Sequence, residues 1–214
     1  MRVRIGNVPR QTHPTKQILI DTVIEMLKSQ SPEELTSEHV LEVSRVSRGS
    51  LYHHFEDFGD LIESALAARY ARFVDESVSA IAQAGLESKS REEYLKFVHA
   101  IAASSHGAER EAARFMRSAA IGAAANNARL RSKLAHEQER LTAALADLIR
   151  EAQSKGFLAS DFEARAAAVF IQSYTLGKVI DDVAITKIDQ DDWNSIVTRV
   201  IDRVFFADAS ASKN

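Results

Sequence analysis

The chain has 214 residues, of which 45% are hydrophobic and 27% are charged, as is typical of a soluble globular protein. It has no cysteine, which excludes disulfides and thiolate metal sites, and it has neither an apolar run near membrane-spanning length nor an evident signal peptide, so we expect a cytoplasmic protein without a membrane partner. The net charge of −3 does not itself predict a nucleic-acid partner, so that hypothesis must rest on local placement.

Helix formers dominate, and only 3 prolines and 8 glycines interrupt them, which predicts an all-α fold of about nine helices without a sheet. Residues 15–30 form the first amphipathic pattern, which ends at Pro32. Two short helices are predicted next, with Thr36 and Ser47 as their N-caps. The very tight turn between the two makes this pair a helix-turn-helix candidate.

The remaining apolar patterns predict longer helices. They cover about 57–84, 90–107, 109–125, 130–155, 160–184 and 189–206. Ser90 and Ser160 are the predicted N-caps of two of them, and Gly85 and Gly156 are the predicted left-handed stops of two others. We expect three segments: 1–58 as a basic arm with Arg2, Arg4 and Arg10 plus a helix-turn-helix domain, 59–207 as a larger helical domain, and 208–214 as a disordered tail.

The stretch SRGSLYHHFEDFGDL raises the question of a metal or catalytic site. His53 and His54 are adjacent, so on a helix they point about 100° apart and do not easily share one ion. Neither a phosphate-binding loop, a nucleophile elbow nor a zinc-protease motif stands out in the chain. The sequence therefore predicts no metal site, no cofactor and no enzyme activity.

A DNA-binding interpretation uses the same residues better. With Leu51 and Phe55 as buried anchors, the polar residues at the start of the third helix face outward, where a helix-turn-helix places its base contacts. Arg48 has the geometry to contact guanine, and Tyr52 and His54 would contact phosphates. The predicted DNA-binding residues are Thr36, Ser37, Arg45, Arg48, Gly49, Ser50, Tyr52, His53 and His54.

The segment LTSEHVLEVSRVSRGSLYHHFEDFGDL resembles the DNA-binding domain of the tetracycline-repressor (TetR) family of transcriptional regulators, and SRGSLYHHF is a close match to its signature. The resemblance covers about residues 16–66. It implies a homodimer that binds double-stranded operator DNA. It also implies an all-helical C-terminal domain with a cavity for a small-molecule effector, whose binding relieves repression.

Four positions depart from the family pattern. Arg45 stands where the turn usually has glycine, which predicts strain or an altered turn, and Leu41 replaces a small residue. Phe58 replaces a lysine that helps to hold a phosphate, and Glu38 stands where a DNA-contacting residue often lies. These changes predict weaker DNA affinity or contacts shifted to the basic arm, although Phe58 with Gly59 is better interpreted as an apolar staple.

The effector cavity has only weak candidates in the sequence, because aromatic residues and methionine at helical spacing also fill ordinary cores. The candidate lining residues are Phe73, Tyr94, His99, Met116 and Tyr174. A metal set of His99, His106 and Glu109 is disfavoured, since Gly107 interrupts it. Arg110, Arg114 and Arg117 either meet an anionic effector or form a solvated face balanced by Glu109 and Glu111, and the solvated face is favoured.

The last two helices carry wide apolar stripes that predict an isologous four-helix dimer interface, with an intramolecular core as the alternative. The predicted interface residues are Phe170, Ser173, Leu176, Gly177, Ile180, Val197, Ile201 and Phe205. The helix over 57–84 is the predicted lever between effector and DNA. An activator, and a helical ligand-binding or interaction protein with a degenerate DNA-reading head, remain as alternative functions.

Overall fold

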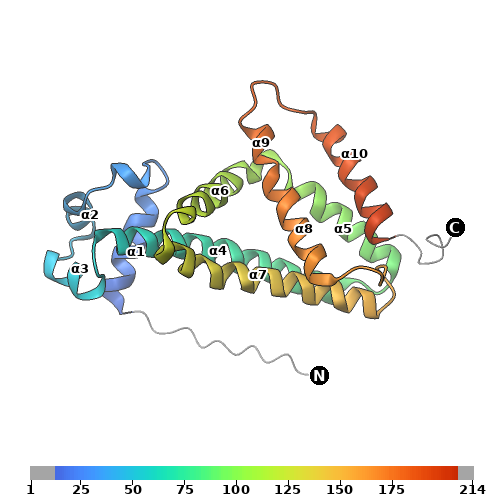
Figure 1. The fold of residues 1–214 in the computed structure, drawn as a ribbon, viewed down its shortest axis with the longest axis horizontal. Coiled ribbons are helices and arrows are strands. Elements are labelled where there is room, and N and C mark those ends of the chain that lie inside the picture. The colour runs from blue at the N-terminus through green and yellow to red at the C-terminus, as the bar shows by residue number, and fades with distance from the viewer. Residues whose placement is uncertain (1–12, 207–214) are drawn as a thin grey trace. The chain divides into compact units, whose positions relative to one another are not determined.

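The computed structural model describes residues 13–206, which form helices and, in that range, no strand (Figure 1). The all-α prediction is therefore confirmed. The predicted basic arm with Arg2, Arg4 and Arg10 and the predicted tail over 208–214 lie outside the described residues. None of the helices within 13–206 combines the length and apolarity needed to cross a membrane.

The helices follow one another with short connections. In chain order they are α1 (Pro14–Met26), α2 (Ser37–Ser44), α3 (Arg48–His54), α4 (Phe58–Glu87), α5 (Arg91–Ser105), α6 (Glu111–Ala125), α7 (Ala128–Ser154), α8 (Ala164–Gly177), α9 (Val179–Asp182) and α10 (Gln190–Val200). Short 3-10 turns cover Pro32–Glu34 and Ala108–Arg110, and a π-helical turn covers Ile201–Phe205. Only Lys178 separates α8 from α9. If these two are counted as one interrupted helix, residues 13–206 contain the expected nine.

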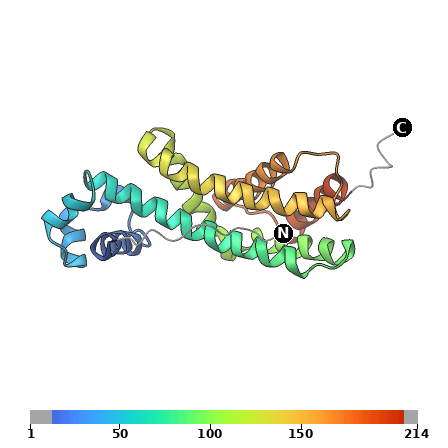
Figure 2. The same ribbon diagram turned by 90° about the horizontal axis from the view of Figure 1, so that it is seen from below.

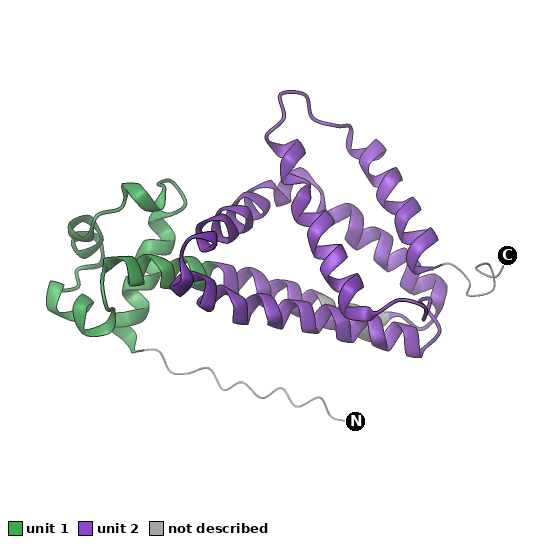
Figure 3. Ribbon diagram, in the orientation of Figure 1, with its two compact units in different colours: residues 1–69 green, residues 70–214 purple. Residues whose placement is uncertain are grey.

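The chain divides into two compact units, residues 1–69 and residues 70–214 (Figure 3). The division falls inside α4, which Figure 2 shows as one uninterrupted helix. The predicted domain boundary between residues 58 and 59 lies at the start of that helix. One helix therefore contributes residues to both units.

The first unit is built around a single apolar core to which α1, α2, α3 and α4 each contribute. Leu19, Val23, Val40, Leu51 and Leu61 are completely buried in it. Burying a side chain of this size stabilises the fold by about 1.5–3 kcal/mol, so these five positions fix how the short helices pack. Without this core, helices as short as α2 and α3 would not be stable.

Both predicted caps of the helix-turn-helix pair are confirmed. The Thr36 hydroxyl accepts a hydrogen bond from the His39 amide at 3.3 Å, and the Ser47 hydroxyl accepts one from the Ser50 amide at 3.2 Å. Phe58 and Leu41, two of the departures from the family pattern, pack against the core of the unit. Their side chains therefore serve packing, as the staple interpretation of Phe58 predicts.

The second unit has its own core, formed mainly by α5, α7, α8, α10 and the turn that follows α10. In it α7 packs against both α6 and α8, and α10 packs against α5 (Figure 1). The predicted stop of α7 is confirmed: Gly156 has φ 71°, and the amides of Gly156 and Phe157 bond to the carbonyls of Gln153 and Ala152 in a Schellman motif.

Two predicted helix ends are wrong. Glu163, not Ser160, caps α8, because its carboxylate accepts hydrogen bonds from the Arg165 and Ala166 amides and so satisfies two unpaired donors. Gly85 does not stop α4, which continues to Glu87. The cost of glycine in a helix interior, about 1 kcal/mol, is small for a helix of 30 residues.

Candidate nucleic-acid interface and ligand cavities

The turn between α2 and α3 has an arginine, not a glycine, in a left-handed backbone conformation. Arg45 ends α2 with φ 56° and ψ 28°, in the left-handed region, and it is the only non-glycine residue with positive φ within 13–206. A side chain in this conformation costs roughly 1–2 kcal/mol. The strain predicted for Arg45 therefore follows from its left-handed backbone conformation.

Replacing Arg45 by glycine is expected to raise the free energy of unfolding by about 1 kcal/mol, because glycine adopts this conformation without a Cβ clash. Urea denaturation measures the change. Arg45→Ala is the control, since alanine removes the charge but keeps the Cβ atom and should give no comparable gain. Equal stabilisation by glycine and alanine would show that charge, and not backbone strain, is responsible.

The start of α3 presents polar groups to solvent while its other side is anchored in the core. Leu51 is completely buried and Phe55 nearly so, whereas Tyr52 is 49% exposed. Arg48 and Gly49 are also exposed. A methyl group added at Gly49 would meet nothing nearer than the Ser47 hydroxyl at 4.0 Å, so packing within the chain does not require glycine there.

Arg48 already has an anionic partner inside the chain. Its guanidinium donates to the Glu38 carboxylate at 2.5 Å, and the Ser37 hydroxyl donates to the same carboxylate at 3.1 Å. Hydrogen bonds from its own backbone amide, Ser37 and Arg48 lower the pKa of Glu38, so the carboxylate is ionised at neutral pH. Any DNA contact by Arg48 must replace this exposed pair.

The start of α2, where Thr36 and Ser37 are predicted to bind DNA, is also affected by Glu38. The Thr36 hydroxyl is used as the cap, and the Ser37 hydroxyl donates to Glu38. A helix start attracts anions through its free amides, but a carboxylate in the first turn opposes a second negative charge. Thr36 and Ser37 therefore lie where the sequence analysis expected them, beside a group that disfavours phosphate.

The histidines of α3 form a small aromatic group with His13. The ring of His54 lies 4.7 Å from that of His13 and 4.9 Å from that of His53, measured between centroids. Desolvation, followed by the charges of His13, His53 and Lys16, lowers the pKa of His54. Within the described part of the chain no three metal-ligating side chains come together. His54 is therefore neutral at neutral pH and available as a hydrogen-bonding group.

The second unit contains two neighbouring cavities. The larger one, called here the arginine cavity, has a volume of about 260 Å³ and is lined by Arg110, Arg114 and Arg117 together with residues such as Phe73 and Gln172. The smaller one, called here the apolar cavity, has a volume of about 120 Å³ and an aliphatic and aromatic lining. The two share part of their lining, namely Ile101, Ser105, Leu145, Ile171 and Thr175.

The five residues predicted for the effector pocket separate into two groups. Phe73 lines the arginine cavity, and Tyr94 and Tyr174 line the apolar cavity, where burial raises the pKa of Tyr94 to about 12 and keeps its hydroxyl neutral. His99 and Met116 line neither of these two cavities. His99 turns instead toward the turn after α10 and pairs with Asp202 at 2.8 Å.

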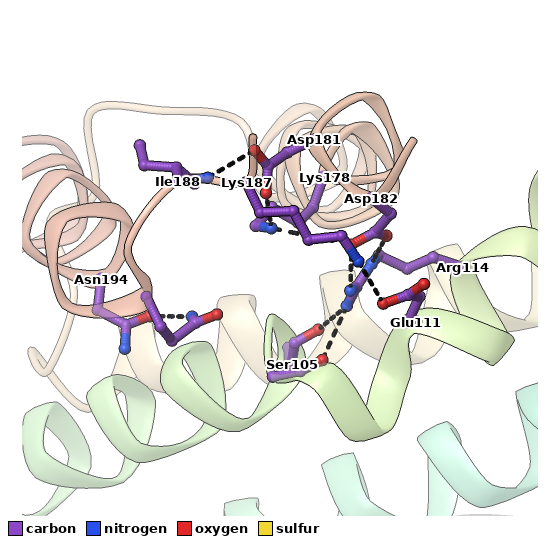
Figure 4. Close-up of polar contacts among 11 residues, drawn as sticks. Ser105, Glu111, Arg114, Lys178, Asp181, Asp182, Lys187, Ile188 and Asn194 are labelled. Atoms are coloured by element: carbon purple, nitrogen blue, oxygen red, sulfur yellow. Dashed lines mark hydrogen bonds and ion pairs between the residues drawn. The ribbon is translucent and has the colours of Figure 1, made fainter. Parts of the chain in front are cut away.

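The arginines of α6 are not a solvated face, contrary to the favoured expectation. Arg114 and Arg117 are only 3% and 5% exposed. Arg114 forms a two-pronged ion pair with Asp182 of α9, at 2.5 and 2.8 Å, and donates to the carbonyl of Gly107 (Figure 4). Glu111, the expected partner, pairs with Lys187 at 3.0 Å instead.

Arg117 differs from Arg114, because no carboxylate within reach belongs to the residues that the structure describes. Its guanidinium lies 4.6 Å from the centroid of the Phe73 ring, and its Nε has no hydrogen-bond partner. The spacing of Arg110, Arg114 and Arg117 predicts that all three share one helical face. In the structure Arg110 lies in the 3-10 turn before α6 and is exposed, whereas Arg114 and Arg117 of α6 are turned inward, which the spacing does not reveal.

Part of the predicted dimer interface lies inside the protomer. Val197, Ile201 and Phe205 are 3–7% exposed and belong to the core of the second unit, so their assignment to the interface is corrected. Of the other predicted residues, Phe170 and Ile180 are 47% and 76% exposed, and Ser173 is also exposed. Leu176 and Gly177 are half-buried. Three further exposed apolar side chains lie nearby in the sequence: Val169 of α8, Ile196 of α10 and Val204 of the π-helical turn after α10.

The whole chain was compared with known proteins. No family model and no curated protein sequence matches it. Solved structures do: a TetR-family regulator of Mesorhizobium loti has a TM-score of 0.67 at 12% identity and covers 89% of this chain and 96% of its own. The chain has the TetR-family fold. GusR of Salmonella enterica has the same TM-score at 15% identity, covering 93% of this chain and 100% of its own.

The TetR-family fold is also that of the transcriptional regulator FadR of Bacillus subtilis, solved in complex with stearoyl-CoA. That structure has a TM-score of 0.57 at 16% identity and covers 86% of this chain and 96% of its own. At such identities the likeness establishes the arrangement of the helices. The functions of individual residues must be argued from this chain.

Proposed function

We propose that this protein is a TetR-family transcriptional regulator that binds operator DNA as a homodimer through α3. The observation that carries the proposal is the combination of a buried anchor at Leu51 with an exposed polar helix start at Arg48 and Tyr52. A helix-turn-helix protein needs this combination, because the helix must be held by the core while its first turn reaches base edges.

In the proposed complex each group at the start of α3 has a separate task. Arg48 contacts a guanine edge, and Gly49 allows the backbone to come close to the DNA. Tyr52 and His54 donate to phosphates, which fixes the register of the helix without reading sequence. Arg45, exposed at the turn, adds a further phosphate contact. Release of Arg48 from Glu38 accompanies binding, so the ion pair lowers the affinity for all sequences.

The cavities of the second unit are the proposed effector site. Phe73 of α4 lines the arginine cavity, while Leu61 and Ala65 of the same helix belong to the core of the first unit. A ligand that displaces Phe73 therefore acts on a helix on which the DNA-binding unit is built. We infer that effector binding favours a dimer unable to match two successive major grooves, so that repression ends.

The proposed homodimer uses the outer sides of α8 and α10. Val169 and Phe170 of α8, Ile196 of α10 and Val204 of the π-helical turn after α10 are each about half exposed. A shallow apolar groove runs beside Phe170 and Ile196. Contiguous apolar surface of this kind marks an interaction site in soluble proteins. Two copies related by a twofold axis would bury these sides against each other as a four-helix interface.

Ile196→Asp is expected to convert the dimer to monomers, because it places a carboxylate in the middle of the proposed apolar interface. Sedimentation velocity measures the mass. Ile185→Asp is the matched control, since Ile185 is fully exposed in the loop between α9 and α10 and should remain dimeric when replaced. Ile201 is unsuitable for this test, because its side chain lies in the core. The same mass for wild type and both variants would contradict the interface.

The proposed function is tested by selecting bound duplexes from a randomised DNA library with the purified full-length protein. The expected result is enrichment of a palindromic sequence whose half-sites are separated by about one helical turn, as a symmetric helix-turn-helix dimer requires. If α3 is anchored in the core and contacts bases with its first turn, this enrichment must be observed. Recovery of unenriched DNA would favour the alternative of a ligand-binding or interaction protein, for which the Arg48–Glu38 pair is the supporting observation.

A further inference from the structure

We propose that the ligand of the second unit is an anionic amphiphile, whose head group binds Arg117 in the arginine cavity and whose aliphatic tail enters the apolar cavity. The shared chemistry of the head group is that of a carboxylate or a phosphate ester. The inference deepens the proposed function by naming the effector class. It concerns binding to the second unit, which is measured without DNA.

The first observation in favour of an anionic ligand is the buried charge of Arg117. The residue is 5% exposed, and within the described side chains it has neither an acidic partner nor an acceptor for Nε. Its guanidinium lies over the face of the Phe73 ring. A guanidinium in such surroundings is unfavourable unless an anion shares the site. Because Arg117 also lines the arginine cavity, that anion has a place to bind.

The other charges around the arginine cavity also favour a negatively charged ligand. Among the described residues that line the arginine cavity, Arg110, Arg114 and Arg117 are cationic and Glu76 is the single acid. Arg114 is neutralised by Asp182, whereas Glu76 and Arg110 are exposed. Arg117 is therefore left as the uncompensated charge at depth. A planar guanidinium binds carboxylates and phosphates through paired hydrogen bonds, which makes it a suitable head-group ligand.

The apolar cavity supplies the place for a tail. No charged side chain is among the described residues that line it, and its walls are formed by groups such as Val98, Leu148 and Ile149. Ile101 and Ile171 line both cavities. A ligand with its head at Arg117 can therefore extend its chain along these shared residues, exchanging water for apolar surface as it does so.

The experiment is calorimetric titration of the full-length protein with decanoate, decyl phosphate, decanol and decyltrimethylammonium, the three ionic compounds below their micelle concentrations and decanol below its solubility limit. Both anions are expected to bind, decanol to bind about tenfold or more weakly, and the cation not to bind, because a charge-assisted hydrogen bond to Arg117 is lost in the last two. A stronger response to decyl phosphate than to decanoate would assign the head group to the phosphate class, and the reverse to the carboxylate class.

Arg117→Met keeps an apolar side chain of similar length over Phe73 and removes the charge. It is expected to abolish the preference for anions while leaving decanol binding unchanged, and Arg117→Lys should retain the preference. Arg110→Met is the matched control, since Arg110 is exposed and should contribute little. A second readout is thermal unfolding: Arg117→Met should raise the melting temperature without ligand, because an unpaired buried charge is removed.

Two results would overturn the proposal. One is equal binding of decanoate and decanol by the wild type. The other is an anion preference that survives in Arg117→Met. The effect of decanoate on DNA affinity is measured separately: binding without any change in DNA affinity would remove the effector role from the proposed function and leave the ligand class intact.

Discussion

Asp182→Asn is expected to destabilise the protein by about 3–5 kcal/mol, the cost of leaving a buried guanidinium without its counter-charge. The side chains of Asp182 and Arg114 are each 3% exposed, and Lys178, also buried, lies 3.8 Å from the same carboxylate. Two buried cations would thus lose part of their compensation together. Guanidinium chloride denaturation at neutral pH measures the loss.

The control is an exposed ion pair that also has two hydrogen bonds. Arg165 and Glu139 form two parallel hydrogen bonds of 2.7 Å, with side chains about half exposed. Glu139→Gln should change stability little, because solvent screens the pair. The double variant Arg114→Met with Asp182→Leu should recover most of the stability lost in Asp182→Asn. Equal effects of Asp182→Asn and Glu139→Gln would show that burial does not decide the cost.

The same pair predicts a pH dependence. Hydrogen bonds from Arg114 lower the pKa of Asp182 below its ordinary value of 3.8, against the opposing effect of burial. The contribution of the ionised carboxylate is therefore fully present above that value and is lost as the pH falls through the lower pKa of the folded state. The stability difference between wild type and Asp182→Asn should be constant near neutral pH and shrink in strong acid.

Arg48→Ala is expected to lower affinity for the selected operator on the order of 10- to 100-fold and to relax the preference at one base pair, since a bidentate contact to guanine is lost. Glu38→Gln is expected to raise affinity, because it frees Arg48 and removes a negative charge beside the DNA. Fluorescence anisotropy with a labelled duplex measures both changes.

The double variant Arg48→Ala with Glu38→Gln separates the two effects of Glu38, namely its pairing with Arg48 and its repulsion of the DNA. In the Arg48→Ala background the gain from Glu38→Gln should shrink to the part due to charge repulsion. Arg150→Ala, which removes an exposed arginine paired with Asp147 on α7, is the matched control and should leave affinity unchanged. A loss of affinity in Glu38→Gln would contradict the view that the ion pair competes with DNA.

Local signals in the sequence were sufficient for the helix-turn-helix pair. Thr36 and Ser47 are caps whose hydroxyls bond amides three residues away, and Gly156 supplies a left-handed stop, so each depends on neighbours along the chain. Interactions of this range can be inferred from residue order. The left-handed conformation of Arg45 was also predictable, once the turn was recognised as one that usually requires glycine.

Contacts between distant segments were not predictable in the same way. Arg114 meets Asp182 across 68 positions, and nothing in the local pattern around either residue identifies the other. The arginines of α6 have acids nearby in sequence, which favoured a solvated face. Their burial follows from how α6 packs in the second unit, and packing of this kind is not encoded by spacing alone.

The stripe on α10 illustrates a further limit. The apolar residues of α10 and of the π-helical turn after it are numerous enough to form two sides. The structure divides them into an inner set at Val197 and Ile201, four residues apart, and an outer set at Ile196 and Val204. Hydrophobic periodicity indicates that such a helix is buried on more than one side. It does not indicate which side faces the core of the same protomer, and the prediction mixed the two.

The central claim, that the exposed start of α3 binds DNA, is tested most directly by a salt titration of affinity for the selected duplex. Wild type and Tyr52→Ala are each titrated with the selected duplex and with a scrambled duplex of the same composition. We expect tight, sequence-selective binding by the wild type that falls steeply with salt, and weaker binding with the same salt slope by Tyr52→Ala, because the lost phosphate contact is an uncharged hydrogen bond. Weak binding that is the same for both duplexes and unaffected by Tyr52→Ala would contradict the account.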